Sequence, residues 1–296
     1  LTVTSSYGTP SGAGWYNSGA TAYAGVSTGT VSGGTGIQYV FASWGGDATG
    51  TNYAQSNAII MNAAKTATAS WTTQYYLTVN NGGHSTATGA GWYNSGTTAY
   101  AGLNIGTVAG TTGTRYVFSS WGTDASGSNY AQSVGITMNA PKTATASWTT
   151  QYYLTISSTY GSPTGEGWYN AGATANFGIT TPASGPTGTR YVFASWSGSG
   201  TGSYTGSTSS TSITINNPIT ETASWTTQYY LTVTSAYGTP SGANWYNSGT
   251  TAYAGLNTGT SGNNIFDHWS NDASGTNYAQ SNGIIMNAPK TAVALW

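Results

Sequence analysis

Histidine is the side chain most often used for acid–base chemistry at neutral pH, and this chain has two, His84 and His268. His84 lies in a glycine-rich segment, where we interpret it as a solvated loop residue. Asp267 comes directly before His268, in the order that an orienting carboxylate could have. Adjacent residues of a strand point to opposite faces, so we expect these two side chains to stay apart. We therefore predict that the chain is not an enzyme and uses no cofactor.

Calcium binding is the second chemistry to consider, because Asp47, Asp124 and Asp272 each begin the phrase Asp-Ala-Ser/Thr-Gly-Ser/Thr-Asn-Tyr. Calcium takes 6–8 oxygen ligands, usually from several carboxylates, whereas each of these segments offers one. The phrase also fits an Asx-turn with glycine at a positive-φ position. We favour the turn, keep the three aspartates as weak calcium candidates, and predict no metal.

Three lysines follow an Asn-Ala-Pro or Asn-Ala-Ala turn: Lys65, Lys142 and Lys290. A lysine–asparagine isopeptide cross-link would need a nearby core carboxylate, and most of the chain has too few. We interpret these lysines as charges at strand starts that discourage edge pairing.

Aromatic pairs are the strongest candidates for binding. Trp-Tyr dipeptides recur at four places, and an exposed ring could stack on a sugar or on another protomer. In each pair the two rings should face opposite sides of a strand, one towards the core and one towards the surface. The candidate interface or glycan-stacking residues are Trp15, Tyr16, Trp92, Tyr93, Trp168, Tyr169, Trp245 and Tyr246.

These candidates lie within a repeat. The phrase Gly-Trp-Tyr-Asn returns around Trp15, Trp92 and Trp168, with a variant around Trp245. A second set of tryptophans, Trp71, Trp148 and Trp225, is spaced by 77 residues, and the last copy is shorter. A period of this kind indicates tandem modules. We place their boundaries at residues 1–73, 74–150, 151–227 and 228–296, and call them repeats 1 to 4.

Within a repeat the pattern is that of β-structure. From Lys142 to Ile156, apolar and polar residues alternate with period two, which is typical of half-buried strands. Five or six strands per repeat are expected, in a small sandwich. The phrase Trp-Thr-Thr-Gln-Tyr-Tyr-Leu-Thr crosses each boundary without glycine or proline. The last strand of one repeat should therefore lead almost directly into the next, giving a stiff, extended rod.

Composition limits the partners. Charged residues make up 4% of the chain, with five basic and six acidic side chains, against roughly 25% in an average protein. This balance excludes nucleic acid as the main partner, and no apolar run approaches a membrane span. Weak charge repulsion favours self-association. No Asn-x-Ser/Thr sequon is present, although O-linked glycans on the Ser and Thr strand faces remain open.

The order Tyr-x-Leu-Thr-Val, Trp-Tyr-x-x-Gly, Tyr-x-Phe-x-x-Trp and Lys-Thr-x-x-Ala-x-Trp resembles the divergent internalin-type B-repeat of bacterial and archaeal surface proteins. The resemblance extends over the whole chain and implies secretion and a structural role. We expect an all-β chain of four tandem immunoglobulin-like sandwiches, with β-grasp-like repeats as the alternative. The leading hypothesis is a structural subunit of an extracellular filament, sheath or cell-surface stalk that polymerises by self-association; the alternative is a multivalent glycan-binding adhesin.

Overall fold

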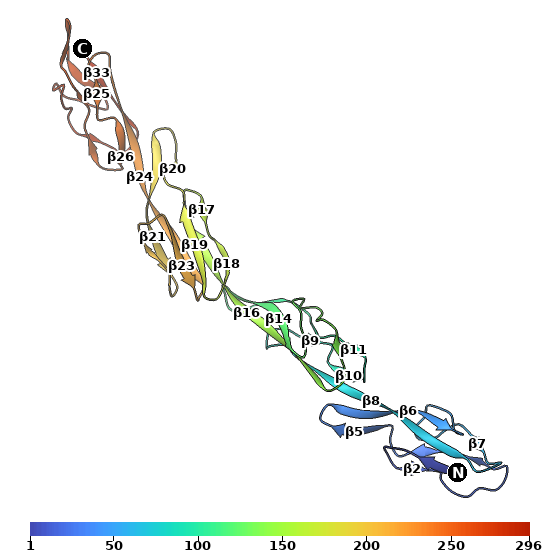
Figure 1. Ribbon diagram of the computed structural model, residues 1–296. Coiled ribbons are helices and arrows are strands. Elements are labelled where there is room, and N and C mark those ends of the chain that lie inside the picture. Colours follow the sequence, from blue (N-terminus) through green and yellow to red (C-terminus); the bar gives the residue numbers. More distant parts are fainter. The chain divides into compact units, whose positions relative to one another are not determined.

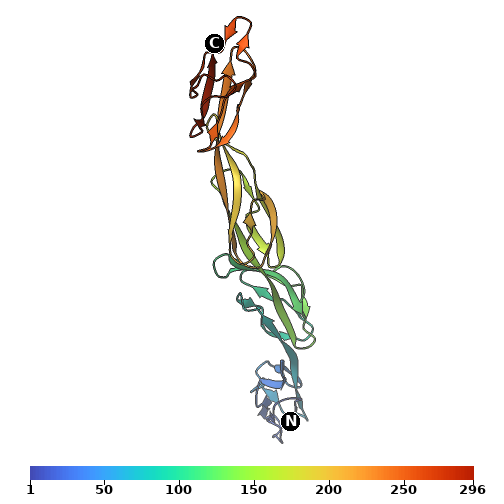
Figure 2. The ribbon, with the colours of Figure 1, turned by 90° about the vertical axis from the view of Figure 1, so that its left-hand side faces the viewer.

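The computed structural model describes all 296 residues, and every regular element is a β-strand (Figure 1). The view turned by 90° likewise shows strands and loops throughout (Figure 2). The chain forms two compact units, residues 1–109 with 115–149, and residues 110–114 with 150–296. The all-β prediction is confirmed, as expected for a chain rich in Thr, Tyr and Trp, which favour strands.

The strands fall into four successive series. The first is β1 (Thr2–Thr4), β2 (Pro10–Ser11), β3 (Thr21–Ala22), β4 (Gly25–Val26), β5 (Thr30–Gly34), β6 (Ile37–Gly46), β7 (Ile59–Ile60) and β8 (Thr66–Asn80). The second is β9 (Ala87–Thr88), β10 (Gly91–Asn94), β11 (Thr98–Ala99), β12 (Gly102–Leu103), β13 (Thr107–Ala109), β14 (Thr114–Thr123), β15 (Ile136–Thr137) and β16 (Lys142–Ser157).

The third series is β17 (Pro163–Thr164), β18 (Gly167–Asn170), β19 (Ala173–Ile179), β20 (Ala183–Ser184), β21 (Thr189–Ser199), β22 (Thr205–Gly206), β23 (Ser210–Ile215) and β24 (Ile219–Ser235). The fourth is β25 (Pro240–Ser241), β26 (Asn244–Asn247), β27 (Thr251–Ala252), β28 (Gly255–Leu256), β29 (Thr260–Ser261), β30 (Asn264–Ile265), β31 (His268–Asn271), β32 (Ile284–Ile285) and β33 (Lys290–Leu295). The strands outnumber the five or six expected per repeat because loop segments also form two-residue pairs.

Three long strands, β8, β16 and β24, cross the predicted repeat boundaries without interruption. Each contains the phrase Trp-Thr-Thr-Gln-Tyr-Tyr, which has no residue that would stop a strand. The prediction that the last strand of one repeat leads directly into the next is confirmed. The two are in fact a single strand.

The principal sheet of each repeat is mixed. In repeat 1, β6 pairs antiparallel with β8 from Ile37 opposite Tyr75 to Gly46 opposite Ala67. The first strand, β1, pairs parallel with the same strand. Parallel pairing of first and last strands recurs between β16 and β24 and between β24 and β33. Immunoglobulin sheets are antiparallel, and the parallel pairs of first and last strands depart from that pattern.

Four clusters of buried side chains form the cores, two in each unit. Alternate residues of the long strands enter them; in β8, Ala67 and Ala69 are buried while Thr66, Thr68 and Ser70 are exposed. This follows the period-two pattern read from the sequence. Each cluster contains one buried tryptophan: Trp44, Trp121, Trp196 and Trp269.

Candidate functional site

The Trp-Tyr pairs of repeats 2, 3 and 4 lie on short strands that pair with the long strand entering each repeat. In repeat 2, β10 pairs antiparallel with β8, so that Trp92 lies opposite Tyr76 and Tyr93 opposite Tyr75. The same register joins β18 to β16 and β26 to β24. We call this arrangement the strand junction.

Two side-chain contacts recur at every strand junction. The rings of Tyr76 and Trp92 meet edge to face, with centroids 5.2 Å apart, a favoured aromatic geometry. Gln74 donates from Nε2 to Asn94 Oδ1 at 2.8 Å. The equivalent ring pairs and amide bonds have the same distances in the other two junctions, at Tyr153–Trp168, Gln151–Asn170, Tyr230–Trp245 and Gln228–Asn247.

The tyrosine of each Trp-Tyr pair has a different role from its neighbour. Tyr93 packs against the core cluster of repeat 2, and its hydroxyl donates to the Gly89 carbonyl at 2.8 Å. Trp92 lies on the other face of the strand and is 40% exposed. The tyrosine hydroxyl bond is repeated at Tyr16, Tyr169 and Tyr246. The tyrosine therefore packs within its own repeat, and the tryptophan makes the ring contact of the strand junction.

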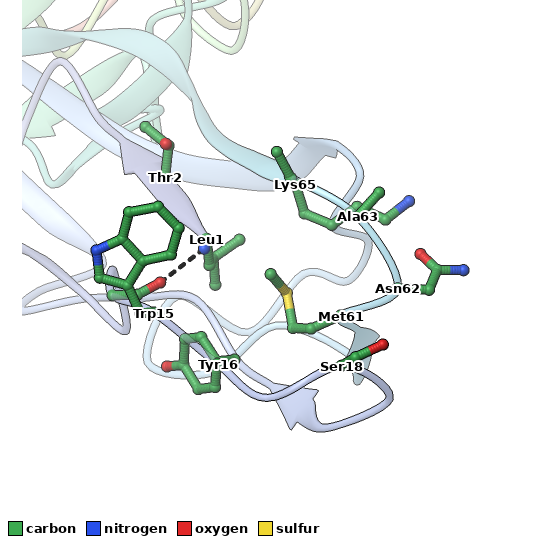
Figure 3. A pocket seen from close by; sticks show the side chains of 11 residues that line it. Leu1, Thr2, Trp15, Tyr16, Ser18, Met61, Asn62, Ala63 and Lys65 are labelled. Carbon is green, nitrogen blue, oxygen red and sulfur yellow. Dashed lines mark hydrogen bonds between the residues drawn. The ribbon is translucent and has the colours of Figure 1, made fainter.

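Repeat 1 has the Trp-Tyr pair without the paired strand (Figure 3). Trp15 is fully exposed, at 104% of its reference surface. Leu1 exchanges two backbone bonds with Gly14, of 2.8 and 3.1 Å. Beyond Gly14 the segment lies beside an open groove of about 530 Å³. Figure 3 shows Trp15 on one side of Leu1, and Met61 and Lys65 on the other.

A hairpin tip completes each strand junction from the other side. The carbonyl of Gly36, at the turn between β5 and β6, accepts from the Tyr76 amide at 3.0 Å. Gly36 has φ +70°, and a Cβ there would lie 2.9 Å from Pro141 Cβ. Glycine is thus required both by conformation and by the close approach of proline. The pairs Gly113–Pro218 and Gly188–Pro289 repeat this contact.

Repeat 4 lacks this hairpin tip. In repeat 1 the hairpin is closed by the bond from the Phe41 amide to the Gly29 carbonyl, and in repeat 4 by that from Phe266 to Gly259. The second hairpin is five residues shorter (41 − 29 = 12 against 266 − 259 = 7). A Cβ on Gly262 at its turn would meet nothing within 4 Å. Repeat 4 therefore has no counterpart of the glycine that docks on proline.

The calcium candidates form an Asp–Lys clamp in the structure. Asp47 accepts from the Thr66 amide at 2.8 Å and from Lys65 Nζ at 3.0 Å. The amide first, and then the ammonium, hold the pKa of Asp47 below its ordinary value. Asp272 makes the same contacts and has its pKa lowered in the same way, and Asp124 also pairs with its lysine.

This clamp corrects two interpretations. The aspartates bond across to the next strand rather than forming Asx-turns, and it is Asn52 whose Oδ1 accepts from the amide two residues later, that of Ala54. The expected positive φ at the loop glycine is confirmed, for example +113° at Gly50. The lysines are also partners of the aspartates, a pairing that was not predicted from the sequence. No three His, Asp or Glu side chains form a group that could hold a metal ion.

Repeat 3 has neither half of the clamp, with Ser199 and Ile219 at the two positions. Two residues further on, Glu221 occupies the place of the buried alanines Ala67, Ala144 and Ala292, and is itself fully buried. Its Oε1 accepts from the Tyr204 amide at 2.7 Å, whereas Oε2 has no partner. Burial raises the pKa of Glu221.

Both histidine interpretations need correction. The ring of His84 stacks on Tyr116 at 3.8 Å, where repeats 1 and 3 have the tyrosine stacks Tyr7–Tyr39 and Tyr160–Tyr191. His84 is therefore half-buried in an aromatic stack, not a solvated loop residue. His268 Nδ1 lies 3.0 Å from Asp267 Oδ2. The two side chains meet because Asp267 precedes β31, so strand alternation does not separate them.

No helix of the chain is long and apolar enough to cross a membrane. Residues 75–151 match the family described as the divergent InlB B-repeat domain. No curated protein and no solved structure matched the chain. The matched residues begin in the boundary phrase at Tyr75 and end at Gln151, one repeat length later. The match favours a surface-associated repeat protein, and residues 75–151 are a divergent InlB B-repeat domain.

Proposed function

We propose that the chain is a non-catalytic structural subunit of an extracellular filament, sheath or cell-surface stalk. In this proposal the four β-sandwich repeats form an extended rod, and protomers join end to end by self-association. The observation that carries it is the sharing of β8, β16 and β24 between successive repeats. A strand that belongs to two repeats joins them without a separate linker segment, which suits a load-bearing or space-filling element.

Further observations support a structural role. The recurring polar contacts, such as Gln74–Asn94 and Asp47–Lys65, join one part of the fold to another. The His268–Asp267 pair is the arrangement closest to acid–base machinery, and its side chains are 44% and 71% exposed. A general base acts best within a desolvated site that also positions a reacting group. We therefore retain the proposal that the chain is not an enzyme.

Electron microscopy of the native chain at physiological salt, without fixation, tests the proposal. Fibres, sheets or tubes with a regular axial repeat are the expected result. Isolated particles at every concentration would contradict polymer formation by this chain alone.

A second candidate is a multivalent glycan-binding adhesin. Repeats 1, 2 and 4 expose equivalent tyrosines, each between 40% and 46% exposed: Tyr23, Tyr53, Tyr100, Tyr130, Tyr253 and Tyr278. Exposed rings at repeated positions can stack on sugars, and weak sites gain avidity through repetition. Oligosaccharide binding that is lost when these tyrosines become alanine, with no polymer in the microscope, would favour the adhesin.

A further inference from the structure

Two of the repeats hold a pair of tyrosine rings face to face. In repeat 1 the rings of Tyr7 and Tyr39 are 11° from parallel, with centroids 3.8 Å apart. In repeat 3 the rings of Tyr160 and Tyr191 are 6° from parallel, with centroids 3.5 Å apart. Aromatic pairs in proteins prefer offset or edge-to-face arrangements with centroids about 4.5–7 Å apart. The rings of these two tyrosine stacks are therefore closer than aromatic packing by itself favours.

The two hydroxyl groups of each tyrosine stack also lie together. A hydrogen bond with the partner phenol, more than burial, raises the pKa of Tyr7 and that of Tyr191. The two rings of a stack therefore point the same way, so that the Cε atoms beside the two hydroxyls lie next to one another. All four side chains are partly buried, which leaves an edge of each stack open to solvent.

The loop tyrosine of each stack is positioned by the serine two residues before it. Ser5 Oγ donates to the Tyr7 carbonyl at 2.5 Å and accepts from Trp71 Nε1 at 3.0 Å. The same two bonds, at 2.7 and 3.0 Å, position Tyr160 in repeat 3. The loop is thereby tied to the last strand of its own repeat, and the approach of the two rings is a property of the fold.

Repeats 2 and 4 lack one of the two phenols. In repeat 2, His84 takes the place of the loop tyrosine and stacks on Tyr116, again at 3.8 Å. Repeat 4 presents Tyr237 through the same serine contacts, but its ring meets that of Trp296 edge to face and has no ring stacked on it. The stacked arrangement thus does not depend on two hydroxyls, whereas chemistry between two stacked phenols is confined to repeats 1 and 3.

We propose that the Tyr7–Tyr39 and Tyr160–Tyr191 stacks are sites of oxidative cross-linking, at which each pair of rings becomes a dityrosine. The reaction takes a one-electron oxidant from outside the chain, such as a haem peroxidase with hydrogen peroxide. Each phenol loses one electron and its hydroxyl proton, which leaves a radical with spin density on Cε.

A carbon–carbon bond then forms between the two adjacent Cε atoms. Each of these carbons loses its hydrogen as a proton, and each phenol oxygen takes up a proton, which restores both rings and both hydroxyls. For each link, two electrons and two protons leave the protein, and one hydrogen peroxide is reduced to two waters.

Contact between the rings before oxidation favours coupling within a stack. Groups that are held together in a productive orientation react with effective molarities of up to about 10⁵–10⁸ M. Exposed tyrosines such as Tyr23 and Tyr253 must instead meet another chain by diffusion. Links within the tyrosine stacks should therefore form independently of protein concentration, while links between chains should increase with it.

A cross-link would join the loop after the first strand of a repeat to a central strand of the same repeat. The central strand is β6 in repeat 1 and β21 in repeat 3. This covalent reinforcement goes beyond the proposed structural function and does not rest on it, because the links should form equally in a chain that does not polymerise.

Oxidation of the full 296-residue chain under native conditions, at several protein concentrations, tests the proposal. The probe is a haem peroxidase with hydrogen peroxide, and the products are mapped by mass spectrometry after digestion with trypsin. Trypsin cuts after Lys142 and Arg190, so it places Tyr160 and Tyr191 in separate fragments. After oxidation these two fragments should be joined and should lack two hydrogens.

The stack of repeat 1 gives a different signature in the same digest. Tyr7 and Tyr39 share the fragment that ends at Lys65. This fragment should lose two hydrogens without being joined to another fragment. Its yield, like that of the joined fragments of repeat 3, should be the same at every protein concentration.

Conservative variants test which phenols react. Tyr7→Phe and Tyr160→Phe keep the stacked ring and remove one hydroxyl, and each should abolish only the link of its own repeat. Tyr237→Phe is the matched control, because Tyr237 is positioned by the same serine contacts without a stacked ring. Both links should form in that variant. Loss of either link in the control, or its persistence in Tyr7→Phe or Tyr160→Phe, would contradict the assignment.

A gain of function is the sharpest test. His84→Tyr supplies the missing phenol in repeat 2 and should add a third link, which joins the tryptic fragment of residues 66–115 to that of residues 116–142. If this link does not form in a chain whose repeat 2 keeps its hydrogen-exchange protection, the approach of the rings does not suffice and the proposal fails. It fails as well if links form at the exposed tyrosines alone and increase with protein concentration.

Discussion

Repeat 3 and the other three repeats place a carboxylate against different parts of the backbone: the aspartates accept from the amide at the start of the last strand, and Glu221 accepts from the loop amide of Tyr204. Repeats 1, 2 and 4 join the start of their last strand to a partly exposed carboxylate that also meets a lysine. Repeat 3 has an isoleucine in place of the lysine and a buried glutamate two residues later. A similar strand arrangement therefore does not require the clamp. The pKa of Glu221 is raised, whereas the pKa values of Asp47 and Asp272 are lowered.

The loop after the core tryptophan explains part of this difference. In repeat 4 the indole nitrogen of Trp269 donates to the Asn277 carbonyl at 2.9 Å, as at Trp44 and Trp121. In repeat 3 the corresponding loop instead forms β22, which pairs with β21 at Trp196. The indole nitrogen of Trp196 consequently has no partner.

The largest expected effect is on the pH dependence of stability, which should run in opposite directions in repeat 3, with its buried Glu221, and in the repeats that have the Asp–Lys clamp. Because the pKa of Glu221 is raised in the folded state, its contribution is complete below its unfolded pKa of about 4.3. That stability is lost as pH rises through the folded value, with a slope of at most about 1.4 kcal/mol per pH unit. Hydrogen exchange of repeat 3 peptides, corrected for intrinsic rates, measures it. Glu221→Gln keeps an oxygen for the Tyr204 amide and should flatten the profile; an unchanged profile would refute the assignment.

The second expected effect is a difference in stability loss between substitutions at two of the core tryptophans, Trp269 and Trp196. Trp269→Phe removes a partly buried bond to the Asn277 carbonyl, whereas Trp196→Phe removes a donor that has no partner. Both lose the same volume. We expect the change in repeat 4 to cost about 1 kcal/mol more than the change in repeat 3. Equal losses of protection, measured by hydrogen exchange in each repeat, would show that the indole bond contributes nothing.

A smaller effect is expected from the clamp itself. The pKa of Asp272 is lowered, so its stabilisation is present above its unfolded pKa of about 3.9 and is lost as pH falls through the folded value. Asp272→Asn should destabilise repeat 4 by less than about 1 kcal/mol near neutral pH, since the pair is open to solvent. Thermal unfolding followed by repeat-specific exchange measures this. Asp267→Asn, a more exposed carboxylate in the same repeat, is the control.

The smallest effect concerns the lysine alone. Lys290→Met removes the ammonium but leaves the bond from the Thr291 amide to Asp272. We expect a loss of about 0.5 kcal/mol or less, shrinking further as salt is added. A loss as large as that of Asp272→Asn would show that the ion pair, and not the amide, dominates the clamp.

Sequence alone predicted the features that depend on local pattern. Period-two alternation located the long strands, and the lack of glycine or proline in the boundary phrase predicted their continuity. Contacts between distant residues were not predicted. Gly36 and Pro141 are 105 positions apart, and each by itself looks like an ordinary turn residue.

The Asp–Lys clamp did leave a signal, because repeat 3 lacks both partners together. Glu221 was harder to interpret: a single glutamate in a strand is usually exposed, and only its alignment with Ala67, Ala144 and Ala292 marks it as buried. His84 was equally hard to interpret from its local sequence. Its stacking on Tyr116 follows only from comparison with the equivalent Tyr7–Tyr39 stack of repeat 1.

The parallel pairing of the first and last strands has a mechanical consequence. In repeat 2 the last strand, from Lys142, pairs parallel and in register with the first, from Leu77. A tensile force that pulls the start of one strand and the end of the other in opposite directions acts along the strands. It loads their hydrogen bonds together in shear instead of opening them one after another. Because each long strand is also the first strand of the next repeat, the force passes between repeats through an unbroken backbone.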